Sequence, residues 1–155
     1  MSPEETLESL RTRPSRWVNE AHLPVLRLRA GGQLSAAARR GLVSDLKAEG
    51  TAGSALHARQ ARPLIEDEDC AALLLALLEA WALGGQPQND RRWLLFATGI
   101  LGDADAIDRL GARVLTESQA KQHRMAGYCV AALARSPHPA APSWLARLSR
   151  TAPSP

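Results

Sequence analysis

The chain has 155 residues, which is the size of one domain and long enough to bury a core without disulfides or metal ions. Hydrophobic residues make up 45% and charged residues 23%, a balance that excludes disorder over most of the length. The sequence contains 28 Ala and 24 Leu but only 5 Val and 3 Ile, which excludes an all-β fold. We therefore predict an all-α fold, with one helical domain over residues 1–150 and a disordered tail over residues 151–155.

The net charge of +3 is unevenly distributed along the chain. Residues 1–65 carry +4, residues 66–108 carry −7 and residues 109–155 carry +6. An acidic centre followed by a basic C-terminal third is typical of a surface that binds partners of defined charge, but also of ordinary solvated helix faces. Seventeen of the nineteen basic residues are Arg, which suits phosphate and carboxylate groups but also accompanies a composition rich in Ala, Gly and Pro.

The first residues of the chain predict a short helix. Ser2 and Pro3 are typical of a helix start, and Leu7 belongs to the apolar side of the helix, which we expect to end near residues 13–14. We assign residues 2–20 to an N-terminal helical arm.

The segment that follows has a mixed pattern. Residues 22–29 alternate apolar and polar side chains, which favours a short extended piece, although the sequence offers no second strand to pair with it. Ser35 begins a helix that ends at Gly50, a typical glycine stop. Residues 50–65 carry only a weak helical pattern. The body of helical repeats covers residues 34–150.

The strongest helical pattern lies in the middle of the chain. One helix begins at the acidic residues after Ile65 and ends at the glycine pair 84–85, and the next runs from about Asp90 to Leu101. Both are apolar on nearly all sides, so we expect them to form the middle layer of the domain, covered on several faces.

The C-terminal third predicts three more helices, over about residues 103–115, 118–135 and 143–150. The loops between them are short, so sequential helices pack antiparallel. We therefore expect antiparallel helical hairpins that are stacked as a short HEAT-like repeat domain.

A set of turn and packing residues matches the pattern of a known family. The shared stretch contains Glu79-Ala-Trp81, Gly84-Gly-x-Pro87, Arg92-Trp93-Leu-Leu, Gly99-Ile-Leu-Gly102-Asp103 and Arg124-x-x-Gly-Tyr-x-Val-x-Ala-Leu-Ala134. It resembles the HEAT-like helical segment of large bacterial proteins related to the molybdate-metabolism regulator MolR, which often carry a WGR domain. His22-Leu-Pro-Val-Leu with Gly31 and Leu34 resembles the entry to that segment. The resemblance covers roughly residues 20–150 and implies the fold, and it brings no catalytic motif with it.

The basic C-terminal third supplies the first candidate site. Arginines on neighbouring helices there are expected to line one basic edge that contacts a partner: Arg109, Arg113, Arg124, Arg135 and Arg147. No recognition-helix motif and no residue set that reads base edges accompanies them. We therefore expect a protein partner for this edge and keep nucleic acid as the alternative.

Two other groups of residues are candidate partner contacts. Trp17, which has Arg16 beside it, is the tryptophan that we expect to be exposed, and Trp and Arg are common at the centres of interfaces. Four consecutive acids begin the strongest helix: Glu66, Asp67, Glu68 and Asp69. The unpaired N–H groups and the dipole of a helix start explain such acids, and a cation or an arginine-rich partner is the alternative interpretation.

No residue pattern in the sequence predicts an enzyme. The four histidines and two cysteines lack the spacing of metal ligands, so we expect no metal and no cofactor. An enzyme similar to the HEAT-like DNA glycosylases would need an aromatic pair and an aspartate in a groove, and Trp93 with Asp90 is the nearest match. The start of the chain is unlike a signal peptide and no apolar run is long enough to cross a membrane, which predicts a cytoplasmic protein.

These observations together predict a non-catalytic helical-repeat module for protein–protein interaction, an adaptor or regulatory subunit in the bacterial cytosol. The alternative function is a nucleic-acid-binding helical repeat that places its C-terminal arginines on phosphates.

Overall fold

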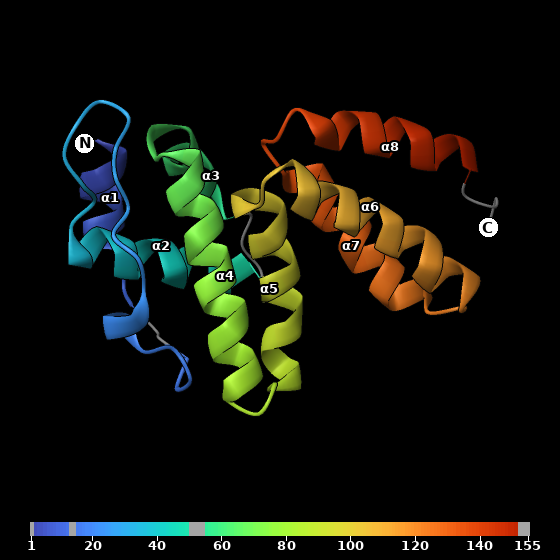
Figure 1. Cartoon of the computed structure of the whole chain (residues 1–155), viewed down its shortest axis with the longest axis horizontal. Coiled ribbons are helices and arrows are strands. Elements are labelled where there is room, and N and C mark those ends of the chain that lie inside the picture. Colours follow the sequence, from blue (N-terminus) through green and yellow to red (C-terminus); the bar gives the residue numbers. More distant parts are fainter. Residues whose placement is uncertain (1, 13–14, 50–54, 152–155) are drawn as a thin grey trace.

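In the computed structural model the chain is all-α, which confirms the predicted fold class (Figure 1). The structure describes residues 2–12, 15–49 and 55–151. Within these ranges it has eight α-helices, two 3-10 turns, η1 (Glu20–His22) and η2 (Arg62–Leu64), and no β-strand beyond isolated bridges. None of the helices in these ranges is both long and apolar enough to cross a membrane.

The helices follow the predicted order along the chain. They are α1 (Pro3–Ser9), α2 (Ala36–Glu49), α3 (Leu56–Ala61), α4 (Asp67–Leu83), α5 (Gln88–Leu101), α6 (Ala104–Gln119), α7 (His123–Arg135) and α8 (Ala140–Thr151). α5 and α8 begin slightly before the predicted residues, and α3 lies where the helical pattern is weak. Of the predicted tail, Thr151 is the last residue of α8, and residues 152–155 lie outside the described ranges.

The first helix begins with a capping box, as Ser2 predicts. The Ser2 hydroxyl accepts a hydrogen bond from the Glu5 N–H (3.1 Å), and the Glu5 carboxylate accepts one from the Ser2 N–H (3.3 Å). This exchange satisfies N–H groups that the start of a helix leaves unpaired. α1 packs against α2, and Leu7 is fully buried there. The helix ends at Ser9, earlier than the end near residues 13–14 that we expected, because the backbone of Leu10 is already extended (φ −69°, ψ 143°).

The segment expected to be extended does find partners. Leu28 forms an isolated antiparallel bridge with Ile65, and Arg27 forms another with Gln33. The described residues contain no second strand, as the sequence predicts, and each of the two bridges pairs single residues. A single bridging residue carries no strand pattern that a sequence could reveal.

α6 and α7 meet at a different place from the one predicted. Ser118, which we expected to begin the second helix, lies in the last turn of α6, and α7 begins at His123. α6 ends in a Schellman motif, in which Lys121 has a φ of 61° and the Gln122 N–H donates to the Glu117 carbonyl (2.7 Å). This left-handed position is usually glycine, so a lysine there gave no signal in the sequence.

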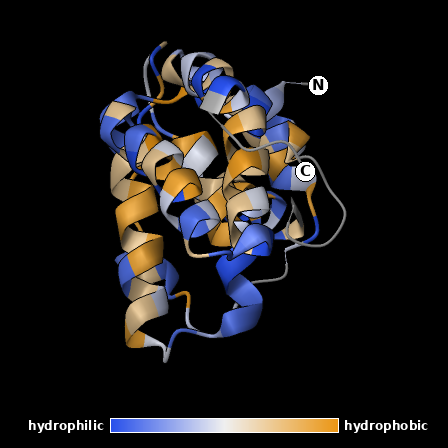
Figure 2. Cartoon of the chain, turned by 90° about the vertical axis from the view of Figure 1, so that its right-hand side faces the viewer, coloured by the Kyte–Doolittle hydropathy of each residue, from blue (hydrophilic) through white to orange (hydrophobic). Residues whose placement is uncertain are grey.

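α5 is the central helix and contributes to two hydrophobic cores. One face, with Trp93, Ile100 and Leu101, packs into the core that includes α1 to α4. The other face, with Leu95 and Phe96, packs into the core that includes α6, α7 and α8. The segment from Trp93 to Leu101 contains no charge, so both faces can be buried. Figure 2 shows hydrophobic residues gathered where the helices face one another.

α4 is covered less completely than its sequence suggests. Leu73 and Leu77 are fully buried, but Leu75 is 57% exposed and Leu83 is 90% exposed. α4 packs chiefly against α5 and leaves its other side open to solvent. The prediction of a middle layer is thus confirmed for α5 and wrong for α4, because only tertiary packing decides which leucines are covered on a helix that is apolar on most sides.

α5 and α7 come into close contact at Gly99. A Cβ atom on Gly99 would lie 2.5 Å from the carbonyl oxygen of Ala132 on α7, closer than side chains and backbone can approach. By contrast, a Cβ atom on Gly127 of α7 would meet no other atom within 4 Å.

We expect Gly99→Ala to lower the free energy of unfolding by roughly 1–3 kcal/mol, because the added methyl forces α5 and α7 apart. Gly127→Ala is the matched control, and helix propensity alone should raise its free energy of unfolding by up to about 1 kcal/mol. Denaturant unfolding measures both variants. A Gly99→Ala protein as stable as the control would contradict the close contact of α5 with α7.

Candidate functional site

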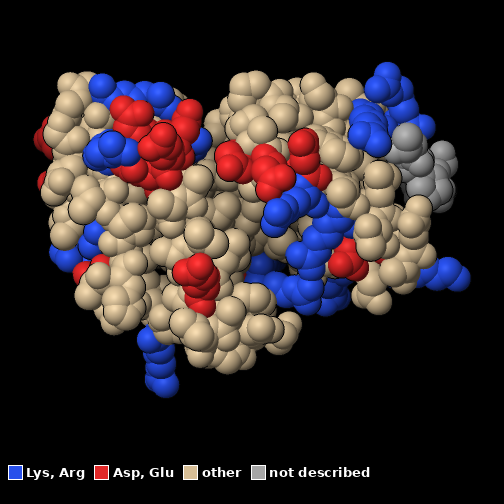
Figure 3. Space-filling view, in the orientation of Figure 1, with Lys and Arg blue, Asp and Glu red and all other residues tan. Residues whose placement is uncertain are grey.

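The charged side chains are not evenly spread over the surface. Figure 3 shows a band of Lys and Arg side chains in the region between α5 and α6, with acidic side chains at one end of it. A second group, over the start of α4, mixes acidic and basic side chains. The two groups differ in their local pairing, and this difference decides which of them is available to a partner.

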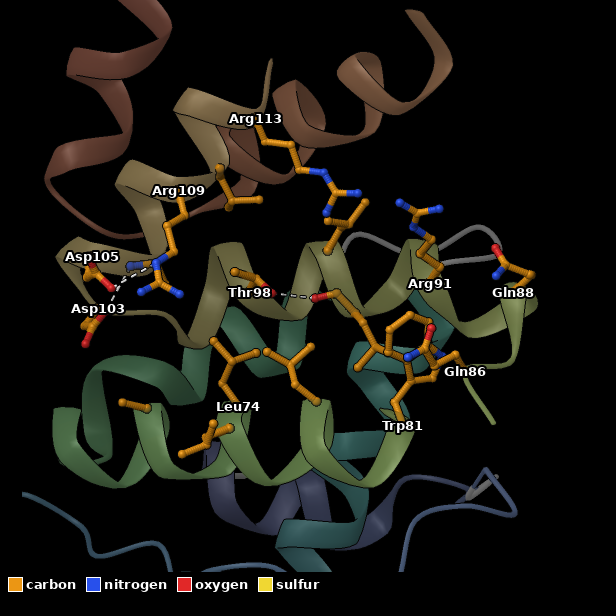
Figure 4. Close-up of a pocket in the computed structure, with 17 residues that line it drawn as sticks. Leu74, Trp81, Gln86, Gln88, Arg91, Thr98, Asp103, Asp105, Arg109 and Arg113 are labelled. Atoms are coloured by element: carbon orange, nitrogen blue, oxygen red, sulfur yellow. Dashed lines mark hydrogen bonds and ion pairs between the residues drawn. The ribbon is translucent and has the colours of Figure 1, made fainter. Parts of the chain in front are cut away.

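The basic band lies on a groove of about 650 Å³ (Figure 4). α4 and α6 form its sides, and α5 lies between them. All three helices contribute to its apolar lining: Leu74, Leu75, Leu78 and Trp81 of α4, Leu94 and Leu95 of α5, and Leu110 of α6. The exposed Leu75 is thus part of a hollowed apolar surface and not an isolated surface leucine.

Three arginines lie along the side of the groove opposite α4. Arg91 comes from the first turn of α5, and Arg109 and Arg113 come from α6. Arg109 and Arg113 are four residues apart, so they share one face of their helix. The side chains of the three therefore form a row beside the leucines.

The acids near these arginines hold them only weakly. The Nε atom of Arg109 is 3.1 Å from Asp105 Oδ2, but both side chains are exposed and water screens the pair. The Nε atom of Arg113 is 3.4 Å from Glu117 Oε1, a long contact. Arg91 makes no hydrogen bond or ion pair with the other residues drawn in Figure 4. The row therefore keeps guanidinium donors that suit the carboxylates of a partner.

Two of the five arginines predicted for the basic edge contact aromatic rings. The guanidinium of Arg135 lies 4.9 Å from the centre of the Phe96 ring, and that of Arg147 lies 4.7 Å from the ring of Trp144. The negative face of an aromatic ring attracts a cation in this position. Neither arginine lines the groove.

The structure brings together only part of the predicted edge. Arg109 and Arg113 line the groove, whereas Arg124 is exposed in the first turn of α7, outside it. Arg91 completes the row but was missed in the sequence, because it belongs to the acidic third of the chain. The sequence does place Arg91 three and four residues before Leu94 and Leu95, a spacing that puts all three on one face of a helix. This spacing is the signal that could have identified Arg91.

The acidic segment at the start of α4 is largely used inside the molecule. Asp69 is buried and accepts hydrogen bonds from the backbone N–H (2.7 Å) and the Nε (2.9 Å) of Arg27. The side-chain hydrogen bond from Arg27 lowers the pKa of Asp69. Asp67 accepts from the buried Arg62 (2.9 Å) and from Arg29 (2.6 Å), and the hydrogen bond from Arg62 is the main cause of its lowered pKa.

The other two acids of this segment add little to a binding surface. The exposed Glu68 reaches Arg27 at 3.4 Å, and the backbone N–H of Glu66 donates to the Arg27 carbonyl (2.9 Å). The segment therefore attaches residues 27–29 to α4. In the part of the chain that the structure describes, no group of three or more His, Cys, Asp or Glu side chains is placed to hold a metal ion.

Trp17 is half-buried and not exposed as we expected. Its ring stacks on that of Trp93, with centroids 5.7 Å apart and planes at 14°. One carboxylate serves both indoles: Trp17 Nε1 donates to Asp90 Oδ2 (2.9 Å) and Trp93 Nε1 to Oδ1 (2.7 Å), and the Ser15 hydroxyl also donates to Oδ1 (3.3 Å). Buried indole N–H groups need such an acceptor, so Trp17 attaches the N-terminal arm to α5.

The same contacts argue against a glycosylase-like site at Asp90. Trp93 is only 2% exposed, and neither Trp93 nor Asp90 lines the groove. Burial by itself would raise the pKa of Asp90, but the hydrogen bonds from Trp17, Trp93 and Ser15 bring it below its usual value. Asp90 is therefore an ionised acceptor within the fold, and its oxygens are occupied by protein donors.

Both cysteines are packing residues. Burial raises the pKa of the Cys70 thiol to about 11, and it also raises that of Cys129. A buried thiol with a raised pKa stays protonated at neutral pH and is a poor nucleophile.

Comparison of the chain with protein-family models, with curated proteins and with solved structures gives no significant match. The resemblance to the MolR-related helical segment therefore stays a prediction from the sequence.

We expect Asp90→Asn to lower the free energy of unfolding by roughly 1–3 kcal/mol at neutral pH, because an amide nitrogen cannot accept from an indole N–H. The pKa of Asp90 is lower in the folded state than in the unfolded state. Its stabilisation is therefore present above the unfolded value of about 3.9 and is lost as the pH falls through the folded value.

Unfolding of the wild type and Asp90→Asn between about pH 2 and 7 should thus show a stability difference that closes at acid pH. Glu79→Gln, which changes an exposed carboxylate of α4, is the control and should differ little from the wild type. A difference that is constant with pH would show that ionised Asp90 does not hold the two tryptophans.

Proposed function

We propose that the domain is a non-catalytic interaction module that binds a protein partner through the groove between α4 and α6. The observation that supports it is the groove itself, in which the exposed Leu75 and the partly buried Leu78 and Trp81 lie opposite a row of arginines. Interface centres are apolar and are enriched in aromatic residues and Arg. Trp81 and the three arginines provide both kinds of residue beside the leucines.

We propose further that the body is a short HEAT-like array, serving as an adaptor or regulatory subunit in the bacterial cytosol. The packing of α4 with α5 and of α6 with α7 supports it, since these are two successive helical hairpins, and α5 also packs against α7. The resemblance of residues 20–150 to the MolR-related segment points to the same architecture. Helical arrays of this kind bind partners on their open faces.

Nucleic-acid binding is the second candidate function, because Arg91, Arg109 and Arg113 form a row of forked donors that also suits phosphates. Asp103 and Asp105 line the same groove. Their carboxylates would repel a phosphate backbone that follows the groove, whereas a protein can place neutral or basic side chains beside them. The mixed charge of the lining therefore favours a protein.

Leu75→Glu tests the groove directly. Leu75 is 57% exposed, so the substitution should leave the fold intact while it places a charge in the apolar wall. Leu83→Glu is the matched control, since it makes the same change on the same helix, at a residue that is 90% exposed and outside the groove. Quantitative affinity purification should recover a partner with the wild type and with Leu83→Glu, and lose it with Leu75→Glu. Equal recovery with both variants would place the interface elsewhere.

Titration with duplex DNA and single-stranded RNA separates the two candidate functions. At physiological ionic strength, about 0.15 M, we expect binding of either nucleic acid to be weak. Tight binding would favour the phosphate alternative if it also depends on salt through these arginines. In that case the slope of log K against log salt concentration should flatten by about one unit for each arginine of the row that is changed to alanine.

A further inference from the structure

We infer that the groove between α4 and α6 binds a single amphipathic α-helix of the partner, with its apolar stripe on Leu75, Leu78 and Trp81 of α4 and with carboxylates facing Arg91, Arg109 and Arg113. This inference rests on the proposed function and specifies the chemistry of its partner. The shape and the charge of the groove support it. The pairing of acidic residues within the chain argues against a second copy as the occupant.

The shape of the groove suits a helix. On α4 the lining runs from Ala71 to Trp81, which at a rise of about 1.5 Å per residue spans about 15 Å, or nearly three helical turns. Leu75, which is exposed, and the partly buried Leu78 and Trp81 follow each other at intervals of three residues. This spacing forms a ridge into which the side chains of another helix pack. The lining residues lie on α4, α5 and α6 and in the turns between these helices, so they offer no strand edge for an extended peptide, and helix-in-groove binding is the mode that fits.

The charge of the groove is graded along its length. Asp103 and Asp105 lie at one end, near the start of α6, while Arg113 and Arg91 lie toward the other end (Figure 4). A complementary helix carries its carboxylates in the part that lies over Arg109, Arg113 and Arg91, and none over the two aspartates. This arrangement also discriminates among partners, because a basic helix would face the arginines at a cost.

A second copy of this chain is a poorer occupant than another protein. The densest group of acids in the chain lies at the start of α4, where Asp67 and Asp69 are already paired with Arg62, Arg29 and Arg27. A second copy could present Asp67 and Asp69 to the groove only by breaking those contacts. We therefore assign the groove to a different protein that carries an acidic amphipathic helix.

Synthetic peptides of about 18 residues, five helical turns, test this assignment. Two peptides share the same leucine stripe at positions i, i+3, i+4 and i+7. They differ only in one half of the peptide, where the positions beside the stripe are Glu in the first peptide and Lys in the second. Fluorescence anisotropy at about 0.15 M salt should show the Glu peptide binding at least tenfold more tightly to the wild type. Circular dichroism should show a gain of helix on binding. Equal affinity for the two peptides, or binding without a gain of helix, would overturn the inference.

A charge exchange makes the test specific to the groove. Arg109→Glu combined with Arg113→Glu should weaken binding of the Glu peptide at least tenfold and strengthen binding of the Lys peptide. Arg124→Glu combined with Arg150→Glu is the matched control, since both arginines are exposed and lie outside the groove, and it should leave the preference unchanged. A preference that changes equally in both double variants would show general attraction to a basic protein, and would overturn the inference.

The outcomes for the helix and for the proposed function can be told apart. If Leu75→Glu loses a cellular partner while neither peptide binds the wild type, the groove is an interface but its occupant is not an acidic helix. If sedimentation shows that the wild type dimerises and Leu75→Glu does not, the occupant is a second copy, and the inference is wrong. If Leu75→Glu changes neither partner recovery nor peptide binding, both proposals fail.

Discussion

The structure depends on the absence of charge between Trp93 and Leu101 of α5. A helix segment without a polar side is stable in water only when other helices cover it on several sides. Two separate cores therefore form around α5, one that includes α1 to α4 and one that includes α6 to α8. Gly99 lets α7 approach closely enough to complete the second core.

The groove follows from this central position of α5. α4 and α6 both pack against α5 but belong to different cores, so a hollow remains where they diverge. The leucines of α4 continue around the helix into that hollow, where Leu75 is left 57% exposed. An apolar surface left over in this way is available to a partner, and the arginines beside it determine the charge of the partner that fits.

Buried polar contacts near α4 and α5 decide which charges remain available. Asp90 binds the two stacked indoles, and Asp69 binds both the backbone and the side chain of Arg27. Their lowered pKa values show that the ionised carboxylates are the forms that the fold stabilises. Because these acids serve internal contacts, Arg109 is left with the exposed Asp105 and Arg113 with a long contact to Glu117.

The sequence by itself determined the fold class and most helix ends, since these depend on neighbouring residues. Asp103 caps α6 by accepting from the Ala106 N–H (3.0 Å), and Gly85, with a φ of 88°, follows the end of α4 as the glycine pair predicts. The end of α6 at Lys121 was missed, because a residue other than glycine takes the left-handed conformation there. Only the tertiary structure decided that Trp17 is half-buried, that Leu75 is exposed, and that Arg91 lies beside Arg109 and Arg113. Each of these depends on which faces of distant helices meet, and a helix that is apolar on most sides can pack by several of its faces until its neighbours are in place.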